Sequence, residues 1–144
     1  MGSSRFPGKP LAKINGRPMI QHVYNNVKKN KLLSDVVVAT CDEIIFDFVQ
    51  SIGGTAVMTS KKHKRASDRC YEAMRVLEKR RKIKYDIVVM VQGDEPMMRP
   101  DMIDVVVEPL RKDSVVNGTV LAMEIIDEEQ FRNPDIVKII HNMA

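Results

Sequence analysis

The stretch YDIVVMVQGDEPMMRP, residues 85–100, decides which fold the chain is expected to adopt. Residues 85–92 are the most strand-like part of the sequence, because β-branched and apolar side chains dominate them. A polar Gly-Asp-Glu-Pro loop follows, and beyond Pro100 apolar residues recur at helical spacing. A buried strand that runs into a polar loop and then a helix predicts an α/β domain, in which ligands bind beyond the carboxyl ends of the strands.

Strands and helices alternate on both sides of this stretch. Further strands are expected at residues 35–40, 55–59, 119–126 and 135–141. The expected helices carry the apolar sets Ile20/Val23/Tyr24/Val27, Ile45/Phe48/Val49/Ile52, Cys70/Met74/Leu77 (with Ser67 as a possible cap) and Ile103/Val106/Val107/Leu110. This order predicts an α/β fold with a mainly parallel sheet. No repeat interrupts it, so residues 1–144 are expected to form one domain.

Composition narrows the class of protein. The 144 residues carry a net charge of +4, which suits a polyphosphate ligand or simple solubility. With no Trp, three Tyr and four Phe, the chain has little material for base stacking, and nucleic-acid binding is not expected. Cys41 and Cys70 have no metal-site or disulfide-framework spacing, which indicates a reducing compartment. No membrane-spanning run or signal peptide is visible, so a cytoplasmic protein that does not bind membranes is expected.

The first residues, SSRFPGKP at 3–10, have the chemistry of a phosphate-binding loop. The hydroxyls of Ser3 and Ser4 would donate to phosphate oxygens, and Arg5 and Lys9 would neutralise charge at the reacting phosphorus. The segment is not a Walker loop, which requires Gly-Lys-Ser/Thr at the start of a helix. A solvated basic tail is the alternative interpretation, and the residues alone leave both open.

Two more segments combine charge with turn residues. In VQGDEP, Asp94 would hold Mg²⁺ against phosphate oxygens, Gly93 would let a nucleotide approach, and Gln92 would bind a sugar hydroxyl or base. The alternative is an ordinary Gly-Asp turn. In KKHKRASDR, residues 61–69, Ser67 and Arg69 would line a nucleotide-facing lip, unless the segment is only a solvated face with a helix cap. The histidines are too scattered to form a metal cluster.

Taken together, SSRFPGKPLAKINGRPMIQHV, HKRASDR, VQGDEPMM and NPDIVKII occur in an order that resembles one family. This family is the 3-deoxy-manno-octulosonate cytidylyltransferases, or CMP-Kdo synthetases, within the CMP-sugar-acid synthetases. The resemblance runs from about Gly2 to about Ile140. It implies a Rossmann-like, glycosyltransferase-A-like nucleotidyltransferase fold with a mixed, mainly parallel sheet.

The resemblance also implies an activity for lipopolysaccharide precursor synthesis. Such enzymes bind CTP with Mg²⁺, a sugar-acid hydroxyl attacks the α-phosphate, and pyrophosphate leaves. The implied catalytic residues are Lys9, Arg5 and Asp94, with Asp94 as the metal ligand. The implied nucleotide-binding set is Ser3, Ser4, Arg5, Lys9, Ser67, Arg69, Gln92 and Gly93. The family writes Gly-Thr-Glu-Arg where this chain has Ala-Ser-Asp-Arg, and its members are commonly homodimers.

The chain departs from the family pattern at its ends. Family members have a first strand before the serine-rich loop, and they continue past the equivalent of Ala144 with the sugar-acid pocket and a second metal-binding aspartate. The chain is therefore expected to be partial, and alone to be inactive and either unstable or self-associating. A non-catalytic fragment with weak nucleotide binding, or an enzyme for another sugar acid such as an acylneuraminate, is the alternative.

Overall fold

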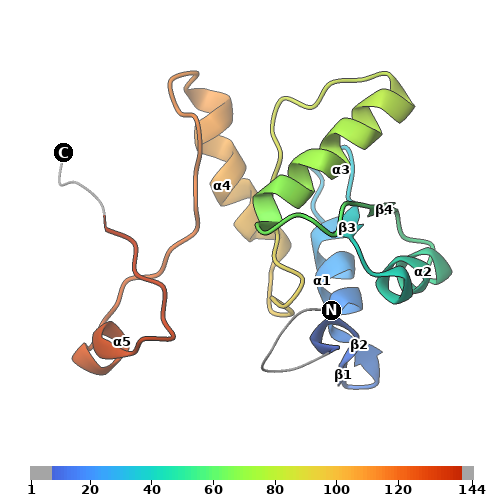
Figure 1. Ribbon diagram of the computed structural model, residues 1–144. Coiled ribbons are helices and arrows are strands. Elements are labelled where there is room, and N and C mark those ends of the chain that lie inside the picture. Colours follow the sequence, from blue (N-terminus) through green and yellow to red (C-terminus); the bar gives the residue numbers. More distant parts are fainter. Residues whose placement is uncertain (1–7, 141–144) are drawn as a thin grey trace.

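The computed structural model describes residues 8–140 (Figure 1). The first elements are the 3₁₀ helix η1 and a short antiparallel hairpin, β1–β2, whose turn residues Asn15 and Gly16 both have positive φ. An Asn-Gly pair favours such a two-residue hairpin turn. In chain order the elements are η1 (Lys9–Leu11), β1 (Lys13–Ile14), β2 (Arg17–Pro18), α1 (Met19–Lys28), β3 (Val38–Thr40), α2 (Glu43–Ser51), β4 (Ala56–Met58), α3 (Ala66–Arg81), α4 (Pro100–Lys112) and α5 (Glu128–Arg132).

The parallel pair β3 and β4 lies between two helices. Val38 pairs with Ala56, and Ala39 pairs with Val57. Because side chains alternate along a strand, Val38 and Ala56 pack with α2, whereas Ala39 and Val57 pack with α3. The two helices therefore cover opposite faces of the pair, as expected for an α/β domain. The buried residues are Ile45, Val49 and Ala56 on one face, and Val57, Ala73 and Leu77 on the other.

A third cluster joins α1 to α4. Val23 and Val27 of α1 pack against Ile103 and Val107 of α4, and Ile103 is fully buried. Burial of each such side chain contributes roughly 1.5–3 kcal/mol. At the ends of the two helices, the buried Asn30 donates from Nδ2 to the Pro100 carbonyl oxygen at 2.8 Å and to Asp104 Oδ1 at 2.6 Å. The helices predicted from apolar spacing at both places are confirmed.

Residues 85–92, predicted to be a strand, are not one in the structure. Their side chains do alternate as in a strand, with Ile87, Val89 and Val91 packed on the α1–α4 cluster and the residues between them exposed. However, the two ladders found among residues 8–140 join only β1 to β2 and β3 to β4. The segment therefore has the burial pattern of a strand, but it pairs with no other strand in the part of the chain that the structure describes.

The strands predicted at 119–126 and 135–141 are also wrong for the residues that the structure describes. Between α4 and Ile140 the chain contains one short helix, α5, and no strand. Met123 is 93% exposed and Ile140 94%, so these apolar segments pack against little. In Figure 1 this part, in orange and red, extends away from the other helices. A strand needs a paired neighbour and a covered face, and here neither is present among residues 113–140.

The structure also bears on membrane-spanning helices, on the cysteines and on clusters of metal ligands. No helix within residues 8–140 combines the length and the apolar character needed to cross a membrane. Cys41 and Cys70 are both free and partly buried, and burial raises the pKa of the Cys70 thiol. No cluster of three or more potential metal ligands occurs in the described range.

Candidate active site

The structure brings together two motifs that lie far apart in the sequence. Lys9 Nζ donates a hydrogen bond to Asp94 Oδ2 at 2.6 Å, across 85 residues of chain. Their side chains are 36% and 43% exposed, so both functional groups reach solvent. The Gly-Lys-Pro segment at residues 8–10 and the Gly-Asp-Glu-Pro segment thus meet at one surface point. We call this point the Lys9–Asp94 end of the site.

Lys9 is positioned by the packing of the residues that follow it. It opens η1, and Leu11 at the other end of η1 packs against the cluster formed by α2 and β4. The backbone N–H of Met19 then donates to the Ala12 carbonyl oxygen at 2.8 Å, which ties η1 to the start of α1. The lysine therefore projects from a short element that is fixed on two sides.

Asp94 is positioned by α1. A Cβ atom on Gly93 would come within 3.1 Å of Ile20 Cδ1, so glycine allows the loop to lie directly against the helix. Six residues further along α1, Asn26 Nδ2 donates to the Pro96 carbonyl oxygen at 3.3 Å. The loop also closes on itself, since Glu95 N–H donates to the Gln92 carbonyl oxygen at 3.3 Å. The carboxylate therefore stands on a turn that is held from behind by a helix.

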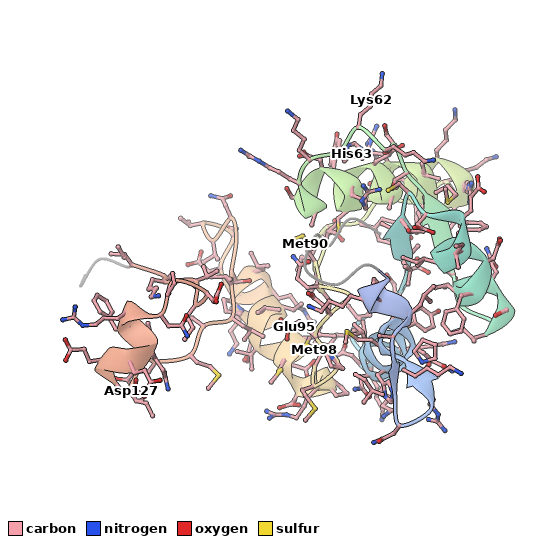
Figure 2. The ribbon with its side chains drawn as sticks, turned by 60° about the horizontal axis from the view of Figure 1, so that its bottom comes forward. Lys62, His63, Met90, Glu95, Met98 and Asp127 are labelled. Atoms are coloured by element: carbon pink, nitrogen blue, oxygen red, sulfur yellow. The ribbon has the colours of Figure 1, made fainter. Side chains whose placement is uncertain are left out.

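Gln92 and Asp94 occupy the exposed row of the 85–94 segment, together with Val88 and Met90. Val88, Met90 and Gln92 are two apart on the extended part of the segment and so point to one side, and the exposed Asp94 follows in the turn that the Glu95 N–H closes on the Gln92 carbonyl oxygen. Figure 2 places Met90 between the Glu95 label, beside α4, and the His63 label, above α3, in that view. The row therefore leads away from the Lys9–Asp94 end.

A second group of polar residues lies at the carboxyl ends of β3 and β4. Thr59 donates from its backbone N–H (2.8 Å) and from its hydroxyl (3.0 Å) to the Thr40 carbonyl oxygen. Arg69 of α3 donates from Nη1 to Thr59 Oγ1 and, at 3.4 Å, to the Ser60 carbonyl oxygen. Arg69 is thus held where ligands of α/β sheets are expected. We call this group the Arg69 end of the site.

The basic segment, residues 61–69, differs in part from its prediction. Ser67 does not cap α3: the helix begins at Ala66, its N-cap residue is Arg65, and no side chain makes a capping hydrogen bond there. Ser67 is instead exposed in the first helical turn. Lys61 is exposed as well, in agreement with a solvated charge. Within residues 8–140 no hydrogen bond or ion pair joins the Arg69 end to the Lys9–Asp94 end.

Ser3, Ser4 and Arg5 lie outside the described residues, so their predicted roles stay predictions. The structure adds residues that the sequence analysis missed. Asn26 and Asn30 anchor the Gly-Asp-Glu-Pro loop and the start of α4. Glu72 binds Ser60 and, in the basic segment, His63. The only sequence signal for Glu72 is its spacing of three from Arg69, which places both on one helix face.

A polar hollow of about 500 Å³ lies elsewhere, on the outer side of α1. It contains neither Lys9 nor Asp94, and one of its cations is already engaged, since Lys29 Nζ donates to Asn26 Oδ1 at 3.1 Å. The lining residues are Arg17, His22, Asn25, Asn26, Lys28 and Lys29. The hollow therefore does not include the Lys9–Asp94 pair, although Asn26, which lines it, also binds the Pro96 carbonyl oxygen of the Gly-Asp-Glu-Pro loop.

Comparison with known proteins gives a consistent result. A family model described as "Cytidylyltransferase" matches residues 1–144. The 3-deoxy-manno-octulosonate cytidylyltransferase of Syntrophus aciditrophicus is 45% identical over 138 residues, which cover 96% of this chain and 54% of that protein. The corresponding protein of Thermodesulfovibrio yellowstonii is 43% identical over 141 residues, which cover 96% of this chain and 55% of the relative.

A solved structure shares the fold. It is the structure of CMP:2-keto-3-deoxy-manno-octonic acid synthetase complexed with CTP, with a TM-score of 0.71 and 42% sequence identity. The match covers 80% of this chain and 45% of the other. The predicted nucleotidyltransferase fold is therefore confirmed. The chain spans about half the length of the curated relatives it matches.

Proposed function

Because the chain belongs to the cytidylyltransferase family, we propose that it acts in transfer of CMP from CTP to a sugar acid, with release of pyrophosphate. The sugar acid we propose is 3-deoxy-manno-octulosonate, since the relatives and the solved structure are named for it. The product would serve synthesis of a cell-envelope polysaccharide such as lipopolysaccharide. The family match over residues 1–144 supports the expectation that they belong to a single domain.

The contact between Lys9 and Asp94 carries this proposal. Transfer of a nucleotidyl group needs positive charge near the phosphates and an oxygen ligand for a divalent cation. The structure has an ammonium and a carboxylate 2.6 Å apart on two motifs that the sequence analysis assigned to these two tasks. An exposed ion pair contributes only roughly 0–1 kcal/mol, so a triphosphate and a metal ion can replace it at little cost.

Each residue then has a chemical task. A hydroxyl oxygen of the sugar acid gives up its proton to solvent and forms a bond to the α-phosphorus of CTP, while the bond from that phosphorus to pyrophosphate breaks. Lys9 and Arg5 stabilise the negative charge that builds up on the phosphate oxygens. Ser3 and Ser4 donate hydrogen bonds to the same triphosphate. The negative charge on the phosphate oxygens is thereby stabilised by enzyme side chains in place of water.

The residues present fit a Mg²⁺ ion that binds together with the nucleotide. Mg²⁺ commonly takes one or two carboxylates and completes its shell with water and substrate phosphates. Asp94 supplies one exposed carboxylate, and no larger ligand cluster occurs among the described residues. When bound, the ion supplies Lewis-acid polarisation of the phosphate oxygens. Asp94 would hold the ion, and Lys9 would neutralise the phosphates beside it.

The cytidine is assigned to the exposed row of residues 88–94 and to the Arg69 end. Gln92 would hydrogen-bond the nucleoside, Gly93 would allow its close approach, and Ser67 and Arg69 would lie near the base. This assignment is supported by the exposure of Gln92 and Ser67, and by the place of Arg69 at the carboxyl ends of β3 and β4. The Arg69 guanidinium is engaged with Thr59, so it would act while holding that residue.

Titration calorimetry of the full-length protein with the four nucleoside triphosphates and Mg²⁺ tests the proposal. CTP is expected to bind more tightly than ATP or GTP, and pyrophosphate release is expected with CTP and 3-deoxy-manno-octulosonate. Equal affinity for all four triphosphates would contradict the cytidine assignment. Omission of Mg²⁺, with Mn²⁺ and Ca²⁺ as comparisons, tests the choice of metal.

The same assay separates the alternatives. Turnover with an acylneuraminate in place of 3-deoxy-manno-octulosonate would assign another sugar acid, and CTP binding without pyrophosphate release would indicate a non-catalytic protein. We also propose a cytoplasmic location, which the two free thiols support, and a homodimer, for which sedimentation analysis is the test. No binding to nucleic acid or membrane is proposed.

A further inference from the structure

The segment that follows β4 is held by one residue, Ser60, whose backbone is bound on both sides. Its N–H donates to Glu72 Oε2 at 2.9 Å, and its carbonyl oxygen accepts from Arg69 Nη1 at 3.4 Å. Its hydroxyl oxygen accepts from the Lys62 N–H at 3.1 Å, which turns the chain into the basic segment. The direction in which residues 61–65 leave the sheet is therefore set at Ser60.

Glu72 makes a second contact within the same segment. Its Oε2 is paired with His63 Nε2, so one carboxylate binds both the first residue of the turn and a residue three positions further on. Arg69 and Glu72 are three apart on α3 and therefore lie on one face of that helix. The pKa of Glu72 is held below its usual range by the Ser60 N–H and by His63. The charged carboxylate is thus the form that binds the segment.

We propose that Glu72 is a positioning residue for the nucleotide, which acts by fixing residues 60–65 and the Arg69 guanidinium at the carboxyl ends of β3 and β4. This inference rests on the proposed function, because it assigns that end of the site to the cytidine. Glu72 does not touch the substrate. It holds Ser60 and His63, and through Ser60 it shares the contact that aims Arg69.

A comparison on the same helix separates positioning from general stabilisation. Glu78, six residues further along α3, is also an ion-paired glutamate, but its side chain is 7% exposed, against 34% for Glu72. Glu78 binds Arg75 within α3 and, beyond the end of the helix, Lys84 and the Tyr85 N–H. Loss of Glu78 should therefore weaken the fold, whereas loss of Glu72 should disturb the segment beside Arg69.

The test compares Glu72→Gln with Glu78→Gln in the full-length protein. A glutamine at 72 keeps an oxygen for the Ser60 N–H but loses the charged contact with His63. His63→Gln removes the same contact from the other side, and Glu72→Asp keeps the charge on a shorter chain. Each variant is titrated with two Mg²⁺-bound probes, CTP and inorganic tripolyphosphate, and its melting temperature is recorded. Tripolyphosphate carries the three linked phosphates of CTP without the nucleoside.

We expect Glu72→Gln and His63→Gln each to weaken CTP binding by about tenfold, the scale of a lost charge-assisted hydrogen bond. Tripolyphosphate affinity should stay within about twofold. The double variant should be no worse than either single one, because both remove one contact. Glu78→Gln should lower the melting temperature and leave the ratio of the two affinities unchanged. Glu72→Asp should recover part of the CTP affinity.

Two results would overturn the inference. One is that Glu72→Gln binds both probes as the wild type does. The other is that it weakens CTP and tripolyphosphate equally, as a loss of folded protein would. A wild-type protein that binds tripolyphosphate but not CTP would instead refute the proposed function, so the two failures are distinguishable. If the wild type binds CTP, and Glu72→Gln and His63→Gln both leave the ratio of CTP affinity to tripolyphosphate affinity unchanged, only the role of Glu72 is refuted.

Discussion

The two ends of the candidate site are built in different ways. The Lys9–Asp94 end is one exposed ion pair between segments 85 residues apart. The Arg69 end is a network in which α3 binds the residues directly after β4 through Thr59 and Ser60. A single surface pair is easily replaced by ligands, whereas several hydrogen bonds along one helix keep their geometry. The first end is suited to changing partners during a reaction, and the second to holding a shape.

The largest effect should follow from changes at the Lys9–Asp94 end. Lys9→Ala and Asp94→Asn are each expected to lower turnover by about a hundredfold or more, the usual scale for loss of a transition-state electrostatic contact. The melting temperature should change little, because the pair is exposed. Pyrophosphate release and thermal unfolding of the full-length protein are the measurements.

Lys61→Ala is the matched control for that experiment. Lys61 is also a lysine near the site, but it is exposed and is interpreted as a solvated charge. Its turnover should stay close to that of the wild type. If Lys61 proved as important as Lys9, the placement of the triphosphate beside Lys9 would be wrong.

A smaller effect is expected from the support beneath Asp94. Gly93→Ala would place a methyl group 3.1 Å from Ile20 Cδ1 and so push the loop off α1, which should lower turnover by about tenfold through misplacement of the carboxylate. Ile20→Val removes the contacting Cδ1 atom, so the double variant Gly93→Ala/Ile20→Val should recover most of the activity. A double variant no better than Gly93→Ala would show that the contact with Ile20 is not the reason.

The link between α1 and α4 should matter for stability more than for chemistry. Asn30→Ala removes a buried side chain at the end of α1 that donates to the partly buried Pro100 carbonyl oxygen and to the exposed Asp104 carboxylate, and it should lower the free energy of unfolding by about 1–3 kcal/mol. Asn25→Ala, an exposed change on the same helix, should cost little. Denaturant unfolding measures the free energy of unfolding of each variant. Equal losses in the two variants would mean that the hydrogen bonds of Asn30 do not stabilise the fold.

The smallest effect concerns pH and the Arg69 end. The pKa of Glu72 is lowered in the folded protein by Ser60 and His63, with Arg69 also nearby. A carboxyl group with a lowered folded pKa stabilises the fold above its unfolded pKa, and this contribution is lost as pH falls through the folded value. Wild-type stability should therefore fall relative to Glu72→Gln below about pH 5. Parallel stability curves from pH 7 to pH 3 would contradict this.

The helices were predictable because their signals are local. Val23 and Val27 in α1, and Ile103 and Val107 in α4, recur at helical spacing and are buried in the structure. The strands β3 and β4 were predictable for the same reason, although they are shorter than their apolar runs. By contrast, residues 85–92 show only the alternating burial of a strand. The hydrogen bonds of a strand depend on a second strand, which the sequence of this segment does not specify.

The candidate site divides along the same line. Side chains of suitable chemistry can be identified from the residues alone: an ammonium at Lys9, a carboxylate at Asp94 and a guanidinium at Arg69. Their contacts come from packing: Lys9 binds Asp94, Arg69 binds Thr59, and Glu72 binds Ser60. The physical reason is range. Side-chain chemistry and helical periodicity are properties of a few consecutive residues, whereas a contact across 85 residues exists only after α1, α4 and the sheet have packed.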